Sequence, residues 1–169
     1  MDHHNDFLYK QANSPRSYDI VLYGSGLETE KLEGKVDYKG FVSSDELIAT
    51  AEGEYGLAWY GSSLEGGSGA LGEYLQYNAP HKMSLYIRCG LPIIVWEKAG
   101  LAPFVKKNNV GICISSLTEL EDILPKISAG QYMEMKKNVL QIADKLSHGY
   151  YCFKAIKQAC ADLGVEIKG

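Results

Sequence analysis

A short segment in the middle of the chain has the residue types of an anion-binding site: Asn78-Ala-Pro-His81-Lys82. We predict a helix over residues 78–89, with Asn78 as its cap and the proline in its first turn, where proline is tolerated. The N–H groups and the positive dipole end of a helix start attract anions, whereas a lysine there is unfavourable to the dipole. Lys82, beside His81, therefore indicates a phosphate or diphosphate ligand. The alternative is that both are ordinary exposed side chains.

Two glycine-containing turns are candidates for contact with a nucleotide. Gly24-Ser25-Gly26 closes a predicted strand but lacks the third glycine and the helix start of a dinucleotide fingerprint, so a tight turn is the simpler interpretation. Gly24 remains a candidate binding residue. In Gly40-Phe41-Val42, Phe41 could stack on a nucleobase while the backbone of Val42 bonds the base edge. A place in the core is equally open for Phe41.

Tyrosine is enriched, with 12 tyrosines against 4 phenylalanines, and several lie close to the predicted phosphate helix. A hydroxyl on a rigid ring suits hydrogen bonding to sugar or ribose. Tyr60 and Tyr86 are therefore candidate binding residues. Tyr86, one turn beyond Lys82, is also compatible with a purely structural role in the core.

Hydrophobic periodicity predicts strands that alternate with helices. We expect strands at 18–23, 36–38, 55–60, 91–96 and 111–114, and helices at 5–12, from Ser43, and at 71–76, 78–89, 97–107 and 116–127, followed by two in the tail. The apolar run 91–96 is typical of a strand buried on both faces of a parallel sheet.

This order of elements predicts an α/β fold, a Rossmann-like three-layer domain with a mostly parallel sheet. Such sheets bind ligands beyond the carboxyl ends of their strands. The stretch 61–70, rich in glycines that no core would need, is predicted to be a mobile loop.

The composition fits one globular domain over residues 1–169: the mass is 18.6 kDa, with 46% apolar and 22% charged residues. The net charge of −4 lacks the excess of positive charge that is typical of nucleic-acid-binding proteins. There is no transmembrane run and no signal peptide, so we expect a cytoplasmic protein.

The four cysteines are widely spaced, and we expect buried free thiols. We predict neither a metal nor a cofactor, and the P-loop, zincin and hydrolase motifs do not occur.

The stretch Gly72–Trp96 resembles the nucleotide-sugar-binding C-terminal half of bacterial GT-B glycosyltransferases. It is most similar to β-1,6-galactofuranosyltransferases and to the second glucosyltransferase that modifies serine-rich adhesins. The family pattern is met by Pro80, Lys82, Tyr86, Gly90 and Pro92, and further similarity lies at Gly40–Leu47 and Trp96–Ala99. The resemblance extends from about residue 7 to residue 128.

The resemblance implies that Lys82 and the helix start bind the diphosphate of a UDP-sugar, of the galactofuranose or glucose type, while Phe41 and Val42 bind uracil. The sugar would pass to a hydroxyl of a glycan or glycoprotein. Many GT-B enzymes bind ribose with a glutamate at the position of Leu85, so here this role is left to Tyr60 or Tyr86. The acceptor-binding N-terminal half has no counterpart. We therefore expect a donor domain that is inactive in isolation, and a homo-oligomer is possible.

Two further hypotheses belong to other functional classes. The chain could be a non-catalytic Rossmann-like interaction module that has lost nucleotide binding, as Leu85 suggests. A flavodoxin-like binding or signalling domain would need an acidic cluster after its first strand, and residues 1–27 do not offer one in that place.

Overall fold

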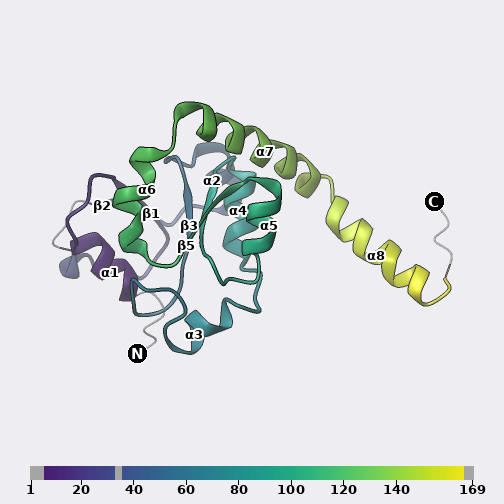
Figure 1. The fold of residues 1–169 in the computed structure, drawn as a ribbon, viewed down its shortest axis with the longest axis horizontal. Coiled ribbons are helices and arrows are strands. Elements are labelled where there is room, and N and C mark those ends of the chain that lie inside the picture. Colours follow the sequence, from purple (N-terminus) through teal and green to yellow (C-terminus); the bar gives the residue numbers. More distant parts are fainter. Residues whose placement is uncertain (1–5, 33–35, 166–169) are drawn as a thin grey trace.

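The computed structural model describes residues 6–32 and 36–165, which form an α/β body from which the last helix extends (Figure 1). All strand pairs are parallel, so the predicted α/β class is confirmed. In the described residues the strands form two sheets rather than one. The first pairs β1 with β2, and the second has the order β3-β4-β5.

The bounds of the strands are close to those predicted from the sequence. They are β1 (Ile20–Tyr23), β2 (Val36–Gly40), β3 (Gly56–Ala58), β4 (Ile93–Trp96) and β5 (Gly111–Ile114).

The α-helices are α1 (Asp6–Asn13), α2 (Ser44–Thr50), α3 (Gly69–Tyr74), α4 (His81–Arg88), α5 (Ala102–Asn108), α6 (Leu120–Ile123), α7 (Ala129–Ser147) and α8 (Tyr150–Asp162). Short 3-10 turns lie at η1 (Thr29–Lys31), η2 (Leu117–Glu119) and η3 (Leu124–Lys126).

The central strand β4 is buried on both faces, as its apolar sequence predicts. Ile93 and Val95 point into a core formed with α4, α5 and α7, whereas Ile94 and Trp96 point into a second core with α1 and α6. The alternation follows from the two-residue period of a strand. Helices thus cover both faces of the β3-β4-β5 sheet, as the predicted three-layer arrangement requires.

Two of the helices predicted after β4 begin or continue differently. The helix expected over 97–107 starts at Ala102, after a turn that includes Gly100. The single helix expected over 116–127 is divided into η2, α6 and η3, because the Ser116 hydroxyl accepts from the nearby N–H of Thr118 and not from Glu119 as a capping box would. By contrast, Ser43 caps α2 as predicted.

The stretch 61–70, predicted from its glycines to be a mobile loop, is hydrogen-bonded and packed against the rest of the molecule. Gly66 donates to the carbonyl of Ser115 at 3.0 Å, and the N–H of Leu117 donates to the carbonyl of Leu64 at 2.9 Å. A Cβ at Gly66 or Gly67 would overlap the Trp96 ring. The glycines are therefore required by packing, because only they leave room for this buried indole.

The tail helices differ in burial. A capping box between Ser128 and Gln131 starts α7, which packs on α4 through Val139 and Ile142. Helix α8 follows the left-handed Gly149 and leads away from the body (Figure 1). Its side chains are largely exposed, so the expectation of buried cysteines is wrong for Cys152, and the other three cysteines are only partly buried.

Candidate functional site

The topology brings the end of β3 and the start of α4 to the same edge of the sheet. The strands β3 and β4 are parallel, so the connecting helix α4 runs back against them. Its first turn therefore lies at the carboxyl edge of the sheet, where the chain leaves β3 through Trp59 and Tyr60. This is the edge at which ligands of parallel α/β sheets bind.

Lys82 and Tyr60 meet at this edge. The Nζ of Lys82 lies 4.6 Å from the centroid of the Tyr60 ring, within the range of a cation–π interaction. Lys82 is half-buried, and burial lowers the pKa of its ammonium group. Among the described residues it has no carboxylate partner, unlike Lys39, which lies 2.9 Å from Asp37 and 3.0 Å from Glu52. A desolvated cation without a counter-ion is suited to binding an anion.

Tyr86 extends the group from the next turn of α4. Its ring covers Gly56, where a Cβ would overlap the ring, so the strand needs glycine at this position. Burial and the neighbouring Tyr60 phenol raise the pKa of Tyr86 to about 12. The structure therefore places Tyr86 with Tyr60 and Lys82, in a partly buried position that combines packing with proximity to the site.

The helix start is three residues later than predicted. Helix α4 begins at His81, and its N-cap is Pro80, which has no side chain capable of capping. Asn78 is not the cap: its backbone N–H bonds to the carbonyl of Tyr74, as part of the turn that ends α3. The prediction failed because Pro80 fixes its own φ and restricts the backbone before it to extended geometry.

In the first turn of α4 the N–H of Met83 donates to the carbonyl of Pro80 at 3.0 Å, which leaves the N–H groups of His81 and Lys82 as the donors that a helix start presents without a partner inside the helix. His81 is exposed and Asn78 is half-buried, both close in sequence to Lys82. The loop after β4 packs against the turn that ends α3, because the N–H of Gly100 donates to the carbonyl of Leu75 at 2.8 Å.

The second predicted group gathers at the end of the β1-β2 sheet. The N–H of Gly24 donates to the carbonyl of Gly40 at 2.8 Å, and the Tyr38 hydroxyl donates to the carbonyl of Gly24 at 2.8 Å. Gly24 therefore lies beside the Phe41–Val42 turn. The side chain of Phe41 is 76% exposed, so the core alternative is wrong and its ring is free to meet a ligand. Val42 is half-buried.

The pairing of Tyr60 with Lys82 is the contact that sequence reasoning missed. Each residue was a candidate by itself, but they are 22 positions apart. The topology of the fold could have predicted this contact. In a β-α-β unit, the residue after the first strand and the first turn of the helix both lie at the carboxyl edge of the sheet.

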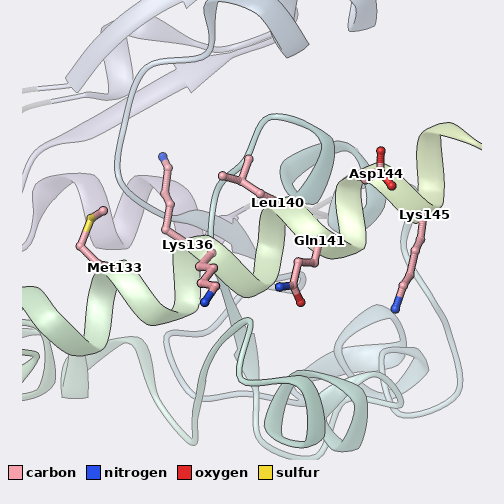
Figure 2. Close-up of a pocket in the computed structure, with 7 residues that line it drawn as sticks. Met133, Lys136, Leu140, Gln141, Asp144 and Lys145 are labelled. Carbon is pink, nitrogen blue, oxygen red and sulfur yellow. The ribbon is translucent and has the colours of Figure 1, made fainter.

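An open hollow of about 630 Å³ lies elsewhere, along α7 (Figure 2). Its lining comes from one helix alone: Met133, Lys136, Lys137, Leu140, Gln141, Asp144 and Lys145. Figure 2 shows Leu140 and Asp144 on one side of the helix and Gln141 and Lys145 on the other. None of the predicted site residues lines it, and no second element among residues 6–32 and 36–165 provides an opposing wall. We therefore place the candidate site at Lys82.

Within the described ranges, no cluster of three or more His, Cys, Asp or Glu side chains is arranged to bind a metal ion. No described helix has both the length and the apolar character needed to cross a membrane.

Comparison with known proteins identifies the family. The family described as "Glucosyltransferase 3-like, C-terminal domain" matches residues 3–159. The chain belongs to this family. Its similarity to the glucosyltransferase 3-like C-terminal domain thus covers both candidate groups of the site and most of α8. The resemblance to glycosyltransferases that the sequence suggested is confirmed.

Curated relatives of this glucosyltransferase 3-like domain are bacterial glycosyltransferases. The β-1,6-galactofuranosyltransferase WbbI of Escherichia coli (strain K12) is 32% identical over 164 residues, which are 95% of this chain and 47% of the relative. Glucosyltransferase 3 of Streptococcus gordonii is 28% identical over 137 residues, 80% of this chain and 40% of the relative. The chain therefore spans less than half the length of these relatives.

Proposed function

We propose that this chain is the donor-binding domain of a glycosyltransferase and that it binds a UDP-sugar. The proposal rests chiefly on one observation, the half-buried Lys82 at the first turn of α4, which has no carboxylate partner in the part of the chain that the structure describes. A diphosphate placed there would be attracted by the lysine charge and by the positive end of the helix dipole, and it would accept hydrogen bonds from free N–H groups of the first turn. The names of the relatives support a sugar of the galactofuranose or glucose type.

The uracil site of this proposal is the turn at Phe41 and Val42. An exposed aromatic ring offers a face for base stacking, and the backbone of Val42 can bond the base edge. Gly24, bonded to Gly40, keeps the neighbouring turn close to this place. Helix α2, which starts directly after the turn, packs on α4, and the Cys89 thiol contacts the Leu47 carbonyl at 3.6 Å. This packing joins the helix that follows the Phe41 turn to α4, at the end of α4 opposite Lys82.

The chemical contribution of this domain would be stabilisation of the leaving group. In the transfer, the bond between the anomeric carbon and the β-phosphate oxygen breaks, and its electron pair remains on UDP. A new bond forms between that carbon and an acceptor hydroxyl, which gives up its proton. Lys82 and the start of α4 would stabilise the negative charge that develops on UDP. The acceptor would be a glycan or glycoprotein bound mainly by a further domain.

Titration calorimetry with UDP tests the proposal. We expect binding by the unmodified chain and a loss of about tenfold or more in Lys82→Ala, because a charge-assisted contact to phosphate is removed. Lys107→Ala is the matched control, since this exposed lysine lies in the last turn of α5, at the opposite edge of the sheet. Absence of UDP binding, or equal binding by Lys82→Ala, would contradict the donor-site proposal.

The alternative function is a non-catalytic interaction module of the same fold. Leu85, on the second turn of α4, favours it, because a carboxylate for ribose is missing there. The same titration separates the two, since a module of this kind has no reason to bind UDP through Lys82.

A further inference from the structure

We propose that Tyr60 is a positioning residue whose ring face holds the Lys82 ammonium group ready for the donor diphosphate, and that its hydroxyl is not needed for this role. This inference rests on the proposed function and adds to it. It also replaces the expectation that Tyr60 bonds ribose through its hydroxyl. The observation behind it is that the Nζ of Lys82 lies 4.6 Å from the centroid of the Tyr60 ring.

The Tyr60 ring can fix the flexible side chain of Lys82 without neutralising its charge. A lysine side chain is long and flexible, and fixing it costs rotamer entropy. A carboxylate would fix it but would also neutralise its charge and occupy its N–H donors, as Asp37 and Glu52 do for Lys39. An aromatic face attracts the ammonium without accepting a conventional hydrogen bond. The three donors of Lys82 therefore stay available for phosphate oxygens.

Tyr60 is well suited to act as a fixed platform, because the chain on both sides of it is anchored. Trp59 is almost fully buried, and its indole N–H donates to the carbonyl of Ser63 at 3.2 Å. The carbonyl of Gly61 accepts from the N–H of Phe7 at 3.3 Å. The partly buried Tyr86 adjoins Tyr60 from α4.

A second tyrosine of the chain provides a matched comparison. The Nζ of Lys145 lies 5.7 Å from the centroid of the Tyr150 ring, at the junction of α7 and α8. Both partners are exposed there, and neither belongs to the carboxyl edge of the sheet. Tyr150→Leu thus removes the same kind of contact outside the proposed site.

The test compares UDP affinity in Tyr60→Phe, Tyr60→Leu, Lys82→Ala and the double variant. We expect Tyr60→Phe to bind within about twofold of the unmodified chain, and Tyr60→Leu to bind about 3- to 30-fold more weakly, the range of cation–π contacts. In the Lys82→Ala background, Tyr60→Leu should have no further effect. Tyr150→Leu should bind UDP like the unmodified chain.

Three outcomes would overturn the inference. If Lys82→Ala weakens binding and Tyr60→Leu does not, the donor site stands and the positioning role falls. Equal losses in Tyr60→Phe and Tyr60→Leu would mean that the hydroxyl contacts the ligand. A further loss from Tyr60→Leu in the Lys82→Ala background would show that the ring acts independently of the lysine. Thermal unfolding of each variant identifies any loss caused by misfolding.

A measurement without ligand keeps this inference separate from the proposed function. An ε-methylene group over a ring is shifted upfield in the proton NMR spectrum, and Lys82→Ala assigns the signal. We expect the shift in the unmodified chain and in Tyr60→Phe, and its loss in Tyr60→Leu. If UDP does not bind, the proposed function fails, while this spectrum still decides whether Tyr60 positions Lys82. An unshifted signal in the unmodified chain would overturn the inference.

Discussion

At the scale of the residue, Lys82 has an environment unlike that of the exposed lysines of this chain. It is half-buried, it faces an aromatic ring, and it has no carboxylate partner among the described residues. Burial disfavours the charged form, so the pKa of the ammonium group is lowered. An anionic ligand would compensate this cost, which connects the electrostatics of the free chain with its proposed ligand.

The lowered pKa of Lys82 predicts how UDP binding depends on pH. The protonated lysine is the form that attracts phosphate, and it loses its proton at a lower pH than an ordinary lysine, whose pKa is 10.5. Affinity should therefore fall as the pH rises through the alkaline range, before an ordinary lysine would titrate. Calorimetry at a series of pH values from neutral upward measures this fall.

Lys82→Arg is the control for this pH series, because an arginine remains charged throughout. Titration of the uracil affects both proteins equally, so the ratio of their affinities reports the lysine alone. A ratio that stays constant across the alkaline range would contradict the prediction.

At the scale of the element, the connection between β3 and α4 positions the site. It leads from Tyr60 past the Trp96 ring and through α3 to His81, and its backbone bonds to Ser115 and Leu117 fix it on the sheet. Pro80 then sets the start of α4. The placement of Lys82 over Tyr60 thus depends on the packing of glycines that lie outside the site.

Gly66→Ala tests how tightly this connection is packed. The added methyl group would overlap the buried Trp96 ring, and we expect the free energy of unfolding to decrease by about 1–3 kcal/mol, as for other overpacked positions. Urea unfolding measures the change.

The matched control in the same loop is Ser68→Ala. The buried Ser68 hydroxyl has no hydrogen-bond partner in the described part of the chain, so its removal should change stability by less than about 0.5 kcal/mol. Equal stability of Gly66→Ala and the unmodified chain would show that this loop is loosely packed.

At the scale of the whole molecule, the 169 residues correspond to less than half of each curated relative. A transferase must hold donor and acceptor together, because much of its rate comes from their orientation. The proposed donor site lies at the carboxyl edge of the sheet. Any residues that position the acceptor hydroxyl would have to face this edge.

We therefore predict that these 169 residues by themselves bind UDP but do not transfer sugar. The measurement is acceptor-dependent release of UDP from UDP-galactofuranose or UDP-glucose in the presence of a glycoside with free hydroxyls. Release should equal that of the Lys82→Ala variant. Robust acceptor-dependent transfer by this chain would contradict the prediction and would mean that it binds the acceptor as well.

Much of the fold could be predicted because local patterns are strong where burial is complete. Strand β4 is apolar throughout, and β5 has the bounds that its sequence predicts. The failures lie where tertiary contacts or proline override the local pattern. The glycines of the loop after Tyr60 indicated mobility, but they are required by an indole some 30 positions later in the sequence. Pro80 similarly moved the start of α4 away from Asn78.

For the site, the sequence by itself determined the family, the α/β class and the candidate residues, because these depend on residue types and short spacings. Only the tertiary structure decided which candidates meet. It paired Lys82 with Tyr60, placed Gly24 beside the Phe41 turn, and showed Phe41 exposed. The physical reason is that these contacts come from the parallel arrangement of strands and the return of α4, which no local pattern records.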